Sequence, residues 1–156
     1  MSSLSRSKSA PRAYFTRGYT ISASHRLHSD ALSTEENRAT FGKCNNPHGH
    51  GHNYRIEITV GGQIATETGM VINMSTLDEI VNQVVISRFD HRNLNLDPLF
   101  QQRVSTTENL CIAIYELLSA PEISASLSPA ALATVRIEET ENNFFEHSGN
   151  SSDLKL

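Results

Sequence analysis

Alternating apolar and polar residues mark two segments of the chain as half-buried strands. In residues 15–25 most odd positions are apolar, and most even positions are serine, threonine or glycine. From position 50 to position 60 the even positions carry histidine, tyrosine, isoleucine and valine, and the odd positions carry polar residues or glycine. A period of two is typical of a strand with one face toward a core. His25 therefore shares the apolar face of the first strand, and His50 and His52 share that of the second.

The segment after the first strand changes character, and a helix follows the second strand. Residues 26–49 contain three acids and no apolar period, so we expect a loop there. In residues 73–89 apolar side chains recur three and four positions apart, which predicts an amphipathic helix. Thr76 followed by Glu79 predicts a capping box at its start.

A second helix is predicted after residue 105. Ser105 or Thr106, followed by Glu108, repeats the capping signature. Leucine, isoleucine and alanine then recur at helical spacing as far as Leu118. Two prolines downstream predict a loop that ends this helix.

Two strands complete the pattern. Val135, Ile137 and Glu139 share one face of a short strand, and the Asn-Asn-Phe sequence at 142–144 predicts a turn into a last strand through Phe145. The order is strand, strand, helix, helix, strand, strand. It predicts an α+β fold in which two helices pack on one face of a four-stranded antiparallel sheet.

Composition excludes several classes of function. The 156 residues fit one domain, with 38% apolar residues, 19% charged residues and a net charge of -4. This balance predicts a soluble protein that binds neither nucleic acid nor a membrane, and no apolar run approaches the ~20 residues of a membrane span. Cys44 and Cys111 are too few for a disulfide framework, which favours a reducing compartment and hence the cytoplasm.

The two ends of the chain are polar. We expect a disordered N-terminal tail over residues 1–12, a single catalytic domain over 13–147 and a flexible C-terminal tail over 148–156. Residues 6–11 match the R-S-x-S-x-P pattern that 14-3-3 proteins bind when its second serine, here Ser9, is phosphorylated. A match this short also arises by chance in a serine-rich tail.

Three histidines form a candidate metal site. If the first two strands pair antiparallel, His25 at the end of one meets His50 and His52 at the start of the other. Three neutral imidazoles with an open fourth position are typical of catalytic zinc. His48 fits the two-residue spacing, but the proline and glycine beside it disfavour a strand there. The alternative is that these histidines are polar loop or core residues, and the absence of an H-E-x-x-H motif disfavours a metalloprotease.

Six segments resemble the 6-pyruvoyl-tetrahydropterin synthase family in order, across about residues 13–146: SASHRL, FGKCNNPHGHGHNY, TGMVINM, DHRNLN, VSTTEN and EETENN. The resemblance implies a T-fold, an antiparallel sheet with two helices on one side. It also implies that subunits join their sheets into a barrel as trimers. Two trimers would stack into a homohexamer with active sites between subunits.

The resemblance also implies roles for ten residues, which match the family's motifs position by position: zinc ligands His25, His50 and His52, with one zinc ion per subunit; catalytic Cys44, Asp90 and His91; and substrate-binding Glu139, Thr106, Thr107 and Glu108. From the residues alone, other interpretations stay open. Glu139 could form a salt bridge, Thr106 and Glu108 could simply cap a helix, and Asp90 with His91 could be a turn after the first helix. Cys111 is expected to pack inside the second helix.

The reaction implied by the resemblance is that of a carbon–oxygen lyase acting on phosphates. It converts 7,8-dihydroneopterin triphosphate to 6-pyruvoyl-tetrahydropterin in tetrahydrobiopterin biosynthesis and releases triphosphate. Cys44 would be the base, and Arg17 and Arg26 are candidates either to hold the phosphates or to form structural ion pairs. Two alternatives remain: the 6-carboxy-tetrahydropterin synthase branch of the same family, and a non-catalytic, zinc-stabilised pterin-binding protein.

Overall fold

The computed structural model describes residues 10–149. Ser9 of the 14-3-3 motif and most of the predicted C-terminal tail lie outside the described residues. The sheet has the order β3-β1-β2-β4-β5, and its strands are β1 Arg12–His25, β2 His50–Gln63, β3 Arg92–Asn93, β4 Ala131–Thr140 and β5 Asn143–His147. Four strands form the predicted antiparallel ladder, which confirms the α+β fold. The short β3 was not predicted, and because it runs parallel to β1 the sheet is mixed.

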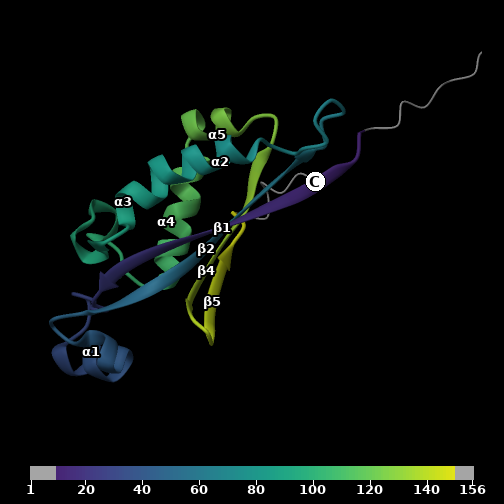
Figure 1. The fold of residues 1–156 in the computed structure, drawn as a ribbon. Coiled ribbons are helices and arrows are strands. Elements are labelled where there is room, and N and C mark those ends of the chain that lie inside the picture. The colour runs from purple at the N-terminus through teal and green to yellow at the C-terminus, as the bar shows by residue number, and fades with distance from the viewer. Residues whose placement is uncertain (1–9, 150–156) are drawn as a thin grey trace, which may run out of the picture.

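Helices cover one face of this sheet, as Figure 1 shows for α2 to α5. The helical segments are α1 Thr34–Phe41, η1 Gly42–Asn45, α2 Met74–Val81, η2 Asn82–Ile86, α3 Ser87–Phe89, η3 Leu94–Leu96, η4 Pro98–Phe100, α4 Thr107–Ser119 and α5 Pro121–Leu127. The π-helical η2 joins α2 to α3, so helical structure runs over residues 74–89. This run and α4 are the two predicted helices.

Three expectations about helices and loops are wrong. The acidic segment after β1 is not all loop, because Ser33 and Glu36 form a capping box that begins α1. The first long helix spans nearly the predicted residues, but Thr76 does not cap it: the cap is Asn73, whose side chain accepts a hydrogen bond from the Ser75 N–H. Pro121 does not end helical structure but begins α5, because proline is well tolerated in the first helical turn.

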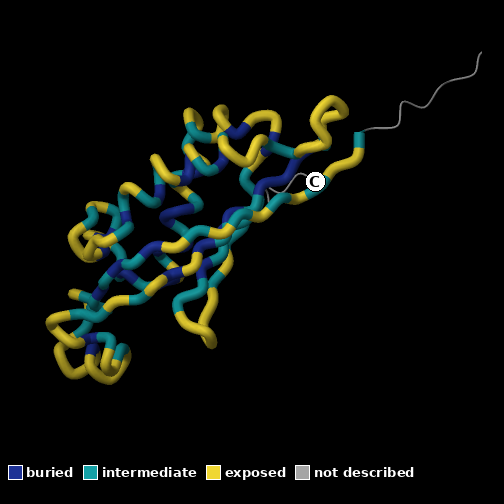
Figure 2. The backbone as a smooth tube through the Cα atoms, in the orientation of Figure 1, coloured by how far each residue is buried: buried dark blue, intermediate teal, exposed yellow. Residues whose placement is uncertain are grey.

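The core lies between the sheet and these helices. On β2 the even positions from Tyr54 to Val60 are fully buried, whereas the odd positions from 51 to 59 are exposed or half-buried. Figure 2 shows this alternation along the central strands. Within residues 10–149 no single helix is long and apolar enough to span a membrane; α4 and α5 reach that length only together, across a 73° bend.

The register of β1 and β2 positions the functional groups. The two strands pair along fourteen residues each, and the last pair is His25 opposite His50. This end of the ladder lies beside the start of α4, because the Ser105 carbonyl contacts the His25 ring. The α1–η1 segment connects the same two strand ends.

Candidate metal and pterin site

The three predicted histidines come together, as the strand register requires. His25 lies opposite His50, and Ala23 lies opposite His52, so all three imidazoles lie on the same face of the sheet. One ligand nitrogen from each ring lies within 4.8 Å of the others. His25 is fully buried, and His50 and His52 are half-buried. The predicted convergence is confirmed.

The donor set fits a metal ion. The Nδ1 atom of His25 lies 2.7 Å from the Ser105 carbonyl oxygen and donates to it, which leaves Nε2 as a lone-pair donor. That Nε2 atom lies 3.1 Å from Nε2 of His50. The Nε2 atom of His52 is buried without a hydrogen-bond partner in the described part of the chain. A buried polar atom without a partner is costly, and a cation shared with its two neighbours would satisfy it.

Burial also favours the protonation state that metals need. It lowers the pKa of His25 and that of His52 below the ordinary value of an imidazole, because a charged ring would lose its hydration. The hydrogen bond that His25 donates to the Ser105 carbonyl opposes this shift without reversing it. Neutral imidazole is the metal-binding form, so these rings are ready to act as ligands near neutral pH.

His48 lies off the strand, as predicted. It is exposed, and its backbone N–H donates to the Asn46 side chain in a turn. Gly49 then passes against β1 with a φ of +71°, and a Cβ atom there would lie 2.8 Å from the His25 carbonyl oxygen. Only glycine fits this close approach, which brings His50 into register.

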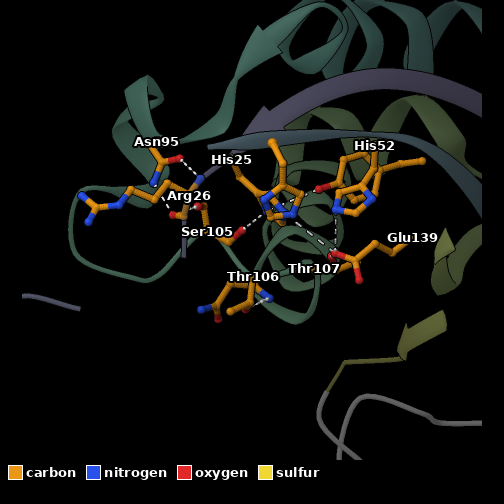
Figure 3. Close-up of polar contacts among 11 residues, drawn as sticks. His25, Arg26, His52, Asn95, Ser105, Thr106, Thr107 and Glu139 are labelled. Atoms are coloured by element: carbon orange, nitrogen blue, oxygen red, sulfur yellow. Dashed lines mark hydrogen bonds and ion pairs between the residues drawn. The ribbon is translucent and has the colours of Figure 1, made fainter. Parts of the chain in front are cut away.

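Glu139 on β4 borders the cluster. Its Oε1 atom lies 3.7 Å from Nε2 of His52 and 4.0 Å from Nε2 of His25. The Thr107 hydroxyl donates a 2.6 Å hydrogen bond to the same oxygen (Figure 3). The carboxylate is therefore held at the edge of the histidine site by the first residue of α4.

Cys44 lies on η1, close to the chain that follows β1. Its carbonyl oxygen accepts a hydrogen bond from the Leu27 N–H, which ties η1 to the chain just after His25. The thiol is free and half-buried. Burial first, and then the charge of Glu139, raise the pKa of Tyr54; Cys44 is a smaller cause of the same shift, which indicates that its side chain lies in the neighbourhood of that hydroxyl.

Asp90 and His91 form a pair at the outer edge of β1. Asp90 accepts hydrogen bonds from the Ser22 N–H at 2.8 Å and from Nδ1 of His91 at 2.9 Å, and in this order they lower the pKa of the carboxyl group. His91 has a φ of 55°, and its side chain is 80% exposed. A hollow of about 430 Å³ beside it is lined by Ser22, His52 and other residues of β1 and β2. Within residues 10–149 no hydrogen bond or ion pair joins this pair to Cys44.

The remaining candidates separate into different environments. Thr107 contacts Glu139, whereas Thr106 caps α4 by accepting from the Asn109 N–H, and Glu108 is exposed on the first turn. The Arg17 guanidinium forms a two-pronged ion pair with Asp78 on α2. The structure therefore favours the ion-pair alternative for Arg17.

Cys111 packs as predicted, whereas the roles of Ser105 and Tyr54 at the site were not predicted. Cys111 is buried in α4, and burial raises the pKa of its thiol to about 12. The thiol therefore stays neutral and packs as an apolar side chain. The role of the Ser105 carbonyl was missed, because a backbone acceptor leaves no signature in side-chain patterns. Tyr54 was read as a core residue, but its hydroxyl also lies 3.4 Å from Nδ1 of His25. Its position two residues after His52 could have signalled this contact.

Fold and site together define a T-fold protein with a three-histidine cluster, suited to hold a metal ion, beside a half-buried carboxylate. Comparisons with known proteins agree: the sequence model described as 6-pyruvoyl tetrahydropterin synthase matches residues 14–150. A Drosophila melanogaster protein named 6-pyruvoyl tetrahydrobiopterin synthase is 48% identical over 141 residues, which are 89% of this chain and 81% of that protein. The chain belongs to the 6-pyruvoyl tetrahydropterin synthase family.

Structural comparison supports the same assignment. The structure of Caenorhabditis elegans 6-pyruvoyl tetrahydropterin synthase superposes with a TM-score of 0.84 at 40% identity, covering 90% of this chain and 98% of that one. A Bacillus subtilis protein named 6-carboxy-5,6,7,8-tetrahydropterin synthase is 32% identical, but over only 53% of this chain and 56% of its own length. The similarity to the pyruvoyl-named proteins is thus both higher and more extensive.

Proposed function

We propose that the chain is a zinc-dependent lyase that converts 7,8-dihydroneopterin triphosphate to 6-pyruvoyl-tetrahydropterin and inorganic triphosphate. The observation that carries this proposal is the convergence of three imidazoles, one with an orphaned Nε2 atom, beside the Glu139 carboxylate. A metal ion at the histidines could bind the side chain of a pterin substrate while the Glu139 carboxylate accepts hydrogen bonds from its ring. Family membership supplies the reaction.

The reaction needs proton transfers rather than an outside oxidant. Loss of triphosphate from the terminal carbon and rearrangement of the side chain turn its two hydroxyl carbons into ketones. These two oxidations release four electrons. Two of them, with one proton, convert the terminal carbon to a methyl group as its C–O bond to triphosphate breaks, and the other two, with two protons, reduce the dihydropterin ring, so the internal redox balances. The enzyme must therefore remove protons from carbon and oxygen and return them elsewhere.

The histidine site would supply the acidity. His25, His50 and His52 would hold one zinc ion per subunit, since three imidazoles with an open position are the donor set of catalytic zinc. When bound, zinc would act as a Lewis acid that stabilises negative charge developing on the substrate's side-chain oxygens. The Ser105 carbonyl orients the His25 ring for this role.

Cys44 is the proposed base, and Glu139 is the proposed anchor. The half-buried thiol lies on η1, beside the end of β1, from which a thiolate could take a proton from the substrate side chain. The Glu139 carboxylate would accept hydrogen bonds from the 2-amino and N3–H groups of the pterin, and Thr107 holds it in place.

Asp90 and His91 are proposed to relay protons. The carboxylate receives Nδ1–H of His91 and so directs the opposite ring nitrogen outward. Because this pair lies at the exposed edge of β1, we propose that it acts on the site of an adjacent subunit in a homohexamer of two stacked trimers. The exposed Tyr14 and Phe144 side chains support such an assembly, since each lies on a strand of the open sheet.

We place the enzyme in a reducing compartment such as the cytoplasm, and the free thiols of Cys44 and Cys111 support this. Thr106 and Glu108 were expected to bind substrate, but Thr106 caps α4 and Glu108 is exposed on its first turn, so we assign the pterin pocket chiefly to Thr107 and Glu139.

A direct test is incubation with 7,8-dihydroneopterin triphosphate, with and without a chelator, followed by identification of products. The proposal expects 6-pyruvoyl-tetrahydropterin and triphosphate, lost on metal removal and restored by zinc. Acetaldehyde with a carboxy-pterin would instead establish the 6-carboxy branch. Cys44→Ala should abolish turnover while zinc content and pterin binding persist; undiminished turnover would exclude the thiol as the base, and binding without any turnover in the wild type would indicate a binding protein.

A further inference from the structure

A pocket of about 560 Å³ lies between the α1–η1 segment and the chain that follows β1. Its lining includes Arg26, Arg38, Lys43 and His28, together with the buried Asn45. These are three permanent cations and one imidazole, and among the described residues no carboxylate lines the pocket. Its composition favours an anion of high charge.

The cations are not neutralised by the protein. Within residues 10–149 no salt bridge is formed by Arg26, Arg38 or Lys43. The exposed carboxylate of Asp30 lies 3.6 Å from Nε2 of His28 but does not line the pocket. Glu36 on α1 is occupied by the Ser33 N–H in the capping box. Like charges gathered without partners repel one another, and a bound anion would relieve that repulsion.

A frame of buried amides holds this cluster in place. Asn45 is 7% exposed; its side chain donates to the Leu27 carbonyl and to Nδ1 of His28, and its backbone carbonyl accepts from Nε of Arg26. In the described part of the chain the terminal nitrogens of Arg26 form no hydrogen bond, so they can contact a ligand. Asn37 is fully buried and fixes α1 by donating to three carbonyls of the preceding turn. The cations are therefore presented by an ordered scaffold.

The pocket adjoins the proposed active site. Lys43 and Asn45 flank Cys44 in η1, and Arg26 directly follows the metal ligand His25. We propose that this pocket binds the triphosphate group of the substrate and retains the triphosphate product until release. The inference rests on the proposed function for the identity of the ligand, whereas the pocket alone requires only that the ligand be an anion of high charge.

The test compares three variants with the same charge change in the zinc-loaded protein. Arg38→Gln and Lys43→Gln alter the pocket, and Arg12→Gln alters an exposed arginine at the far end of β1. Calorimetric titration with inorganic triphosphate should show Kd raised about tenfold or more by each pocket variant and unchanged by Arg12→Gln. Binding should also weaken with added salt. Equal affinities in all variants would overturn the proposal.

Kinetics separate this inference from the proposed function. With 7,8-dihydroneopterin triphosphate, Arg38→Gln should raise KM while kcat and zinc content stay near wild type, since Arg38 lies on α1 and is neither a proposed metal ligand nor a proposed proton-transfer group. Turnover with KM unchanged in both pocket variants would refute the pocket and leave the function standing. Triphosphate binding that depends on Arg38, in a protein that shows no turnover, would refute the function and leave the pocket standing. Circular dichroism confirms that each variant is folded.

Discussion

The two adjacent threonines at the start of α4 offer a sharp test of how the pterin site is built. Thr107→Val keeps the size and branching of a side chain that is 2% exposed, but removes the 2.6 Å hydrogen bond to Glu139. Hydrogen bonds to charged groups contribute about 1.5–3 kcal/mol. If that energy holds the carboxylate in the orientation the pterin needs, kcat/KM should fall by roughly ten- to a hundredfold. The assay is steady-state turnover of 7,8-dihydroneopterin triphosphate, with zinc content measured in parallel.

Thr106→Val is the matched control. The Thr106 hydroxyl caps α4 by accepting from the Asn109 N–H and has no hydrogen bond to Glu139. Loss of such a cap costs about 1 kcal/mol of stability, which corresponds to a Tm lower by about 2–4 °C. We expect this variant to keep kcat/KM. The reasoning is refuted if Thr107→Val retains wild-type kcat/KM, or if the two variants lose activity equally.

Three further predictions concern stability and assembly. Burial by itself would raise the pKa of Asp97. Its hydrogen bonds and its charge pairing with Arg88 together lower the pKa by more than burial raises it, so the folded pKa lies below the ordinary value. The stability that this ion pair contributes is present above pH ~4 and is lost as pH falls through the folded pKa of Asp97. The urea midpoint of Asp97→Asn should therefore decline less steeply below about pH 5 than that of the wild type. Parallel plots of midpoint against pH for the two proteins would contradict this. Arg17→Ala should lower Tm by removing the ion pair with Asp78 and leave KM unchanged, whereas a raised KM would restore Arg17 as a phosphate ligand. Multi-angle light scattering should give about six times the chain mass of 17.3 kDa, and a monomer in the active preparation would exclude the proposed assembly.

The histidine site could be predicted because local periodicity alone specifies it. Residues two apart on a strand point the same way, and antiparallel pairing of two such strands brings His25 to His50. The Thr107–Glu139 contact could not be predicted from pattern, because its partners lie 32 residues apart on a helix and a strand. The resemblance to a known family named both residues but not their hydrogen bond.

The helix α1 was missed for a different physical reason. Apolar periodicity reveals a helix only when an apolar face packs on the core. This helix is instead fixed by the Ser33–Glu36 capping box and by buried Asn37, whose amide satisfies carbonyls of the preceding turn. Polar anchoring of this kind is specified by individual hydrogen bonds, which composition and period do not display.

The position of His25 opposite His50, as the final pair of the β1–β2 ladder, links metal affinity to folding. The last pair of a ladder has no further pair to support it, so fraying of the two strands would begin there. A metal ion bound by histidines of both strands would cross-link the strands at that end. Because the ligands meet only when β1 and β2 are paired, tighter metal binding would stabilise the paired strands against local unfolding by the same free energy. Amide hydrogen exchange at the end of β1 would therefore measure how tightly the metal is held.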